Sequence, residues 1–146
     1  MSLTLIRSLT FALFSLFSFT ALIPVSLAAT PAEIAAGVRT KWAESKKNLE
    51  AAVKPLAGQP AHAELITKYL QATDKTGELL DQYLKLKLVT PPTAPAVLTP
   101  VVDQLIKSLT SLKTLKGQAK GPLINLLGSA VAQQQETAQN ALKNIR

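Results

Sequence analysis

The hydrophobic residues of this chain recur at helical spacing from about residue 31 to the end. The clearest stretch is 60–88, in which apolar residues three and four positions apart alternate with charged residues. Residues at this spacing share one face of a helix that has about 3.6 residues per turn. The pattern predicts four amphipathic helices, over about 31–54, 60–88, 100–116 and 122–145.

The expected helix starts coincide with capping residues and prolines. Thr30, Pro31 and Glu33 have the form of a capping box, in which the two polar side chains satisfy free amides of the first turn. Pro60 and Pro122 stand at the starts of two further helices, where a missing N–H costs little. We therefore expect these helices to begin close to these positions.

Prolines dominate the stretch between the second and third predicted helices. Residues 89–100 contain four prolines and three threonines, and proline cannot extend a helix. We interpret this stretch as an extended connection between two helical hairpins, formed by 31–88 and 99–146. Such helices favour an all-α antiparallel four-helix bundle. The alternative is a five-helix arrangement, in which residues 91–98 add a short turn of their own.

The N-terminal segment has the features of a secretory signal peptide. Arg7 precedes an apolar run over residues 9–23, and Ser26 and Ala28 place small residues at the −3 and −1 positions of a cleavage site. The run is shorter than the ~20 residues that a membrane-spanning helix needs. The sequence predicts cleavage after residue 28 and a secreted, extracellular protein, with the cell wall or periplasm as further locations. We do not expect an integral membrane protein.

The composition argues against catalysis. The chain has no cysteine and one histidine, His62, which argues against thiol chemistry and against metal sites built from cysteines or several histidines. Asp74, Glu78 and Asp81 form a carboxylate cluster, but it lies with lysines on the polar face of a helix. A perturbed carboxylate pair needs burial or isolation, so we interpret the cluster as solvated ion pairs. We expect no enzyme activity, no catalytic residue, no metal and no cofactor.

The charge of the chain bears on its partners. The formal net charge is +7, the lysines are spread over the helices, and two arginines, Arg39 and Arg146, follow the predicted signal peptide. Arginine is the residue suited to bidentate recognition of phosphate, so we expect no nucleic-acid partner. Anionic glycans or membrane headgroups are the electrostatic partners that this charge favours.

The apolar helix faces contain polar interruptions that bear on binding. Thr73, Thr76 and Gly77 interrupt the face of the second predicted helix, and Gln134 interrupts that of the fourth. One interpretation is a packed core in which these side chains are hydrogen-bonded. The other is an underfilled interior that holds an apolar ligand. The residues that would line such a site are Val38, Trp42, Leu49, Tyr69, Thr73, Thr76, Leu80, Tyr83, Leu105, Leu109, Leu127, Val131 and Gln134.

The last fifty or so residues carry a set of short motifs that resemble a known family. These motifs are Pro100-Val101-Val102-Asp103-Gln104-Leu105, Leu109 with Leu112, Leu127-Gly128 with Ala130-Val131, and Thr137 with Ala141-Leu142 and Ile145. They are similar to the fungal hydrophobic surface-binding protein A family, which includes cell-wall galactomannoproteins. The resemblance implies secreted helical proteins that adsorb to apolar surfaces, some of which hold a fatty acid inside the bundle.

Two functions follow as expectations from this pattern. The first is a secreted, non-enzymatic helical protein that binds apolar material, either a hydrophobic surface or a lipid such as a fatty acid within the bundle. The alternative is a secreted protein-interaction module, such as an effector or a structural component of the cell wall, that uses the charged helix faces.

Overall fold

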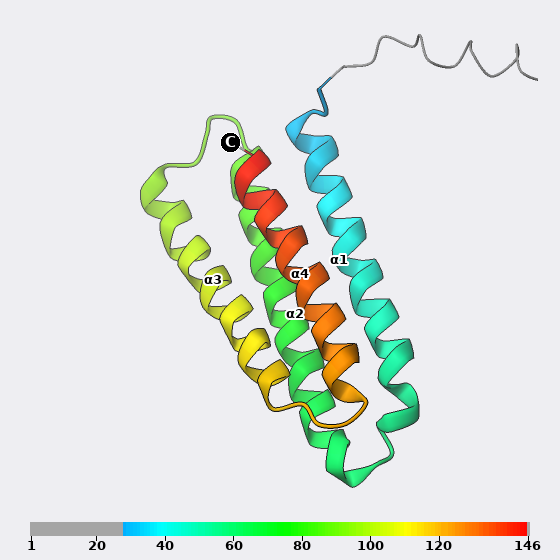
Figure 1. Cartoon of the computed structure of the whole chain (residues 1–146). Helices are drawn as coiled ribbons and strands as arrows, with labels where there is room; N and C mark the ends of the chain where they lie inside the picture. The colour runs from blue at the N-terminus through cyan, green and yellow to red at the C-terminus, as the bar shows by residue number, and fades with distance from the viewer. Residues whose placement is uncertain (1–27, 146) are drawn as a thin grey trace, which may run out of the picture.

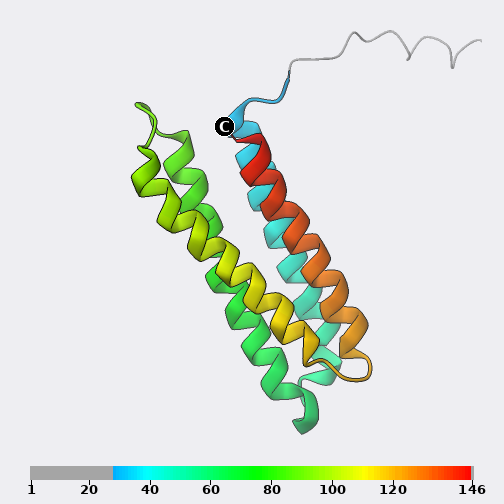
Figure 2. The same ribbon diagram turned by 60° about the vertical axis from the view of Figure 1, so that its left-hand side comes forward.

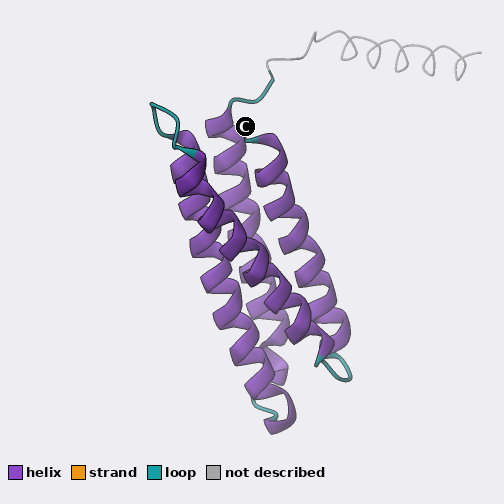
Figure 3. Ribbon diagram, turned by 90° about the vertical axis from the view of Figure 1, so that its left-hand side faces the viewer, coloured by secondary structure: helices purple, strands orange, loops and turns teal. Residues whose placement is uncertain are grey.

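The computed structural model describes residues 28–145 and forms an all-α four-helix bundle (Figure 1). Its elements are α1 (Pro31–Val53), the short 3₁₀ helix η2 (Lys54–Leu56), α2 (Pro60–Leu88), α3 (Pro95–Gly117) and α4 (Leu123–Asn144). No strand occurs within this part of the chain (Figure 3). The expected fold class is therefore confirmed. The predicted signal peptide lies outside the described residues, apart from Ala28.

The four helices run alternately up and down, and the two ends of the bundle differ in the connections that they carry. Figures 1 and 2 place the α1–α2 and α3–α4 connections at one end of the bundle. The α2–α3 connection lies at the opposite end, together with the start of α1 and the end of α4. The most extensive contacts join α2 to α3 and α1 to α4, while α1–α2 and α3–α4 contacts are fewer.

The two expected hairpins are present, but they pack more extensively on each other than their own helices pack together. Helices adjacent in sequence within each predicted hairpin make fewer contacts than the pairs α2–α3 and α1–α4. The physical reason is that an apolar stripe on a helix is wide enough to cover two neighbours. The stripe predicts that a helix is buried on one side, but it does not predict which neighbour covers most of it.

The start of α1 has the capping geometry that the sequence predicts. The backbone N–H of Glu33 donates to Thr30 Oγ1 at 3.2 Å, and the backbone N–H of Thr30 donates to Glu33 Oε2 at 2.7 Å. These hydrogen bonds from Thr30 lower the pKa of the Glu33 carboxyl, because they favour its charged form. The capping box is thus confirmed.

The predicted start of the third helix was wrong by five residues, because α3 begins at Pro95 rather than at Pro100. Pro95 occupies the first turn, where no N–H is needed. Pro100 lies inside the helix, where it removes one backbone hydrogen bond. Leu98, in the added turn, packs against the core and offsets that loss. Residues 95–98 therefore belong to α3, and the five-helix alternative is wrong.

Candidate functional site

The structure places every residue of the predicted apolar site in the bundle interior. All thirteen side chains, from Val38 on α1 to Gln134 on α4, are buried, and none has more than 8% of its surface exposed. The core also includes Ile66 and Leu84 of α2, which the pattern did not assign to the site.

The polar side chains in this interior hydrogen-bond one another. Tyr69 donates from its hydroxyl to Gln134 Oε1 at 3.0 Å, and Gln134 Nε2 donates to Thr73 Oγ1 at 3.3 Å. The hydroxyls of Thr76 and Ser108 lie 2.5 Å apart. Because buried polar groups are costly without partners, this pairing explains how the core tolerates them. Burial also raises the pKa of the Tyr69 hydroxyl well above its usual range.

A hollow of about 310 Å³ lies on the seam between α1 and α2, and it brings part of the interior to the surface. Its lining combines buried apolar residues with charged residues at the rim, namely Arg39, Trp42, Ala43, Lys46, Asp74, Gly77, Leu80, Asp81 and Leu84. Trp42, Leu80 and Leu84 are each at most 7% exposed. We call this feature the Trp42 hollow.

The absence of a side chain at Gly77 is what allows the Trp42 ring to pack against α2. A Cβ atom at this position would lie 2.5 Å from Trp42 Nε1 and 3.1 Å from Trp42 Cδ1. The first distance is far below van der Waals contact and the second is tighter than ordinary contact, so any larger residue would displace the ring. The glycine that appeared in the sequence as an interruption of the apolar face is therefore a packing requirement.

Two ion pairs cross the Trp42 hollow from α1 to α2. Arg39 Nε lies 2.7 Å from Asp81 Oδ1, and Lys46 pairs with Asp74. Asp81 Oδ2 also accepts from Lys85 at 2.7 Å. Hydrogen bonds from Lys85 and then Arg39 lower the pKa of the Asp81 carboxyl, and the bond to Asp74 raises the pKa of Lys46. These side chains are all at least a third exposed, so each pair contributes only about 0–1 kcal/mol.

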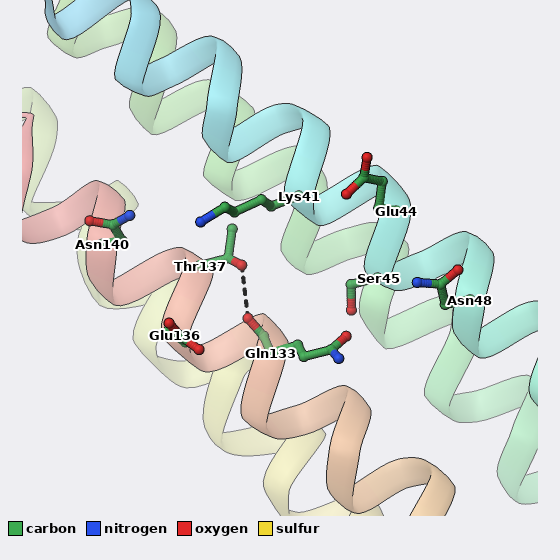
Figure 4. A pocket seen from close by; sticks show the side chains of 8 residues that line it. All are labelled: Lys41, Glu44, Ser45, Asn48, Gln133, Glu136, Thr137 and Asn140. Carbon is green, nitrogen blue, oxygen red and sulfur yellow. Dashed lines mark hydrogen bonds between the residues drawn. The ribbon is translucent and has the colours of Figure 1, made fainter. Parts of the chain in front are cut away.

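A second hollow, of about 240 Å³, lies between α1 and α4 and has a different chemistry (Figure 4). It is lined by polar residues alone, namely Lys41, Glu44, Ser45, Asn48, Gln133, Glu136, Thr137 and Asn140. Ser45 is 4% exposed, and its hydroxyl has no hydrogen-bond partner among residues 28–145. We call this feature the polar groove.

The described residues also bear on the expectations about chemistry and membranes. Within residues 28–145, no three histidine, aspartate or glutamate side chains gather in a way that could hold a metal ion. None of the helices in this range combines the length and the apolar character needed to cross a membrane. Of the carboxylate cluster on α2, Asp74 and Asp81 form ion pairs, as interpreted from the sequence.

The ion pairs of α2 differ in whether the sequence of one helix indicates them. The ion pairs within α2, Glu64 with Lys68 and Asp81 with Lys85, follow the expected spacing of four residues. The pairs that join α1 to α2 carry no such signal, because they depend on how two helices are rotated against each other.

Comparisons of this chain with protein-family models, with curated proteins and with solved structures found no match.

Proposed function

We propose that this chain is a secreted, non-enzymatic protein that binds apolar material, with a fatty acid as the specific ligand class. The observation that supports this proposal is the Trp42 hollow, because core side chains such as Trp42, Leu80 and Leu84 line it at the surface of one seam. The resemblance of the C-terminal motifs to the hydrophobic surface-binding protein A family points in the same direction.

The chemistry of the Trp42 hollow suits an amphiphile with one acidic end. Trp42, Leu80 and Leu84 offer apolar surface for an acyl chain. Arg39 and Lys46 lie at the rim and can exchange their carboxylate partners on α2 for a ligand carboxylate. A volume of about 310 Å³ is at the lower end of the ~300–1,000 Å³ typical of ligand pockets, so a long chain would need additional space.

The arrangement of the helices offers a source of that additional space. The pairs α1–α4 and α2–α3 are joined at one end by two short connections and have the fewer contacts between them. Parting the pairs at the other end would extend the hollow into the interior without breaking either pair. A wider opening would present the apolar stripes to a hydrophobic surface, so adsorption would occur by the same route.

Trp42 emission tests the proposal directly, because this is the only tryptophan of the chain. Fatty acids of increasing length should change the emission saturably. Each added CH₂ should tighten binding about fourfold, which corresponds to about 0.8 kcal/mol per buried CH₂. Gly77→Ala should weaken binding because the new methyl group displaces the ring, while Gly37→Ala, with nothing within 4 Å of the added carbon, should leave it unchanged.

A further variant tests whether a bound acyl chain extends from the Trp42 hollow into the deep interior of the bundle. Val131 is buried on α4 and does not line the Trp42 hollow, so Val131→Phe should weaken long chains while sparing short ones. If fatty acids leave the emission unchanged and hydrophobic beads do not deplete the protein from solution, apolar binding is refuted. The interaction-module alternative would then take its place.

A further inference from the structure

We propose that the polar groove between α1 and α4 is a binding site for a neutral carbohydrate. This site is separate from the Trp42 hollow, and the inference does not depend on apolar binding. It rests on three observations: the matched polar residues on the two helices, the unpartnered hydroxyl of Ser45, and the apolar hollow that adjoins the groove.

The polar side chains that the two helices contribute have the same spacing along each helix. On α1 they follow the spacing i, i+3, i+4, i+7 from Lys41 to Asn48, and on α4 they follow the same spacing from Gln133 to Asn140. Such spacing normally carries the apolar stripe of a packed helix. Figure 4 shows the two rows lying along facing sides of the antiparallel helices. A polar strip thus runs along the seam of one of the two most extensively packed pairs.

Ser45 is the residue that points to a ligand. Its side chain extends from α1 toward α4 in Figure 4, and it is 4% exposed with no hydrogen-bond partner among residues 28–145. By contrast, the hydroxyl of Thr137 in the same groove donates to the carbonyl oxygen of Gln133 at 2.8 Å. Burying an unpaired hydroxyl is unfavourable, and a ligand hydroxyl would supply the missing partner. The exposed side chain of Gln133 is the one that would move to admit it.

The groups in the groove select hydroxyl-rich, uncharged ligands. Asn48, Gln133 and Asn140 each carry an amide that both donates and accepts, which matches sugar hydroxyls. One lysine and two glutamates give the groove a slightly negative balance, which disfavours an anion. The amide, hydroxyl and carboxylate groups of these residues also disfavour an acyl chain, because the chain would desolvate them without replacing their hydrogen bonds.

A smaller hollow next to the groove supplies the apolar contact that a sugar ring needs. This hollow, of about 140 Å³, shares Ser45, Asn48 and Gln133 with the polar groove. Its remaining lining is mostly apolar, with Leu49, Ala52, Leu126, Ser129 and Ala130. A sugar ring is amphipathic in a matching way, because it has hydroxyls on one side and C–H groups on the other. The groove volume, about 240 Å³, lies below that of drug-sized ligand pockets and suits one sugar unit.

Proton–nitrogen NMR of the isotope-labelled protein tests this assignment, because side-chain amides are observed individually. The probes are glucose, mannose and N-acetylglucosamine, each alone and as its linear trimer. We expect saturable shifts in the millimolar range at the amides of Asn48, Gln133 and Asn140. Asn125, an exposed asparagine on α4 outside the groove, should not respond. If a trimer binds more tightly than its monosaccharide, the ligand is the end of a glycan chain. If the two bind equally, the ligand is a free monosaccharide.

Three variants distinguish a binding role from a structural one. Ser45→Ala should weaken sugar binding roughly two- to tenfold, the equivalent of one hydrogen bond, while raising the thermal midpoint because an unpaired hydroxyl is removed. Asn48→Ala should also weaken binding, and Asn125→Ala should not. The proposal is overturned if no neutral sugar shifts these amides, if Asn125 shifts equally, if only glucuronate or spermidine binds, or if Ser45→Ala and Asn48→Ala bind as tightly as the parent protein.

Discussion

Ser45 lies on the apolar face of α1, although its hydroxyl is unpaired among residues 28–145. A buried polar group without a partner costs about 1–3 kcal/mol, and alanine also favours the helix slightly. We expect Ser45→Ala to raise the free energy of unfolding by about 1 kcal/mol, measured by urea denaturation at an unchanged m-value. Ser111→Ala, at an exposed helical position, should change it by no more than about 0.5 kcal/mol. Destabilisation by Ser45→Ala would contradict this account.

The glycines at positions 37 and 77 form a matched pair, since both lie inside helices. Gly37→Ala should stabilise the protein by about 0.5–1 kcal/mol, because alanine loses less conformational freedom on folding. Gly77→Ala should lose that gain, because its Cβ would lie 2.5 Å from Trp42 Nε1. The Trp42 emission maximum should also move to longer wavelength as the ring is pushed toward water. Equal stabilisation by both substitutions would show that the ring relaxes without cost.

At the scale of elements, helical periodicity was sufficient to predict which stretches form helices. The second helix runs over Pro60–Leu88, as expected from its pattern. The start of α3 differs from the expected one for a specific reason, because Pro91, Pro92 and Pro95 all favour extended chain unless they stand in the first turn of a helix, as Pro95 does. Proline near a helix start is tolerated, and the turn that Pro95 starts places Leu98 against the core.

The candidate sites were predicted only in part, for a related reason. Periodicity identifies the buried face, so residues such as Tyr69 and Gln134 were correctly expected in the interior. Both hollows lie instead on seams between two helices. Which residues line a seam depends on how each helix is rotated and on which helices are its neighbours. The sequence of one helix alone determines neither. Ser45 is recognisable in the sequence as a polar residue on an apolar helix face. The groove that it lines cannot be recognised there, because α1 forms this groove only together with α4.

The stability that the ion pairs between α1 and α2 contribute should depend on pH because of Asp81. Its pKa lies below the ordinary value of 3.8 because Lys85 and Arg39 donate hydrogen bonds to the carboxylate. A folded-state pKa below the unfolded value means that Asp81 contributes stability above the unfolded pKa and loses it as pH falls through the folded pKa. We expect Asp81→Asn to reduce the loss of stability as pH is lowered below about 4.

Urea denaturation at a series of acidic pH values measures this effect. Asp103→Asn is the control, since Asp103 has no ion-pair partner among the residues described. A pH dependence in Asp81→Asn that equals that of the parent protein would rule out a contribution from the seam. High salt should also diminish the difference, because the pair is partly exposed.

At the scale of the whole molecule, α1 is the helix that both proposed sites share. Trp42 lines the hollow toward α2, and Ser45 lines the groove toward α4. The two sites therefore lie on different seams of one helix, and a fatty acid should not compete with a sugar. Any parting of the helix pairs leaves the polar groove intact, because α1 and α4 stay together.

The close pairing of α1 with α4 also has a consequence for how the molecule folds. These two helices lie at opposite ends of the described sequence, so their contacts join residues that are far apart along the chain. A high sequence separation between contacting residues slows folding. During synthesis, α2 can dock on α3 and on part of α1 as soon as these helices have emerged, whereas the side of α1 that packs on α4 stays uncovered until the last helix emerges. Until then the side of α1 that packs on α4 is uncovered, and a chaperone can bind it.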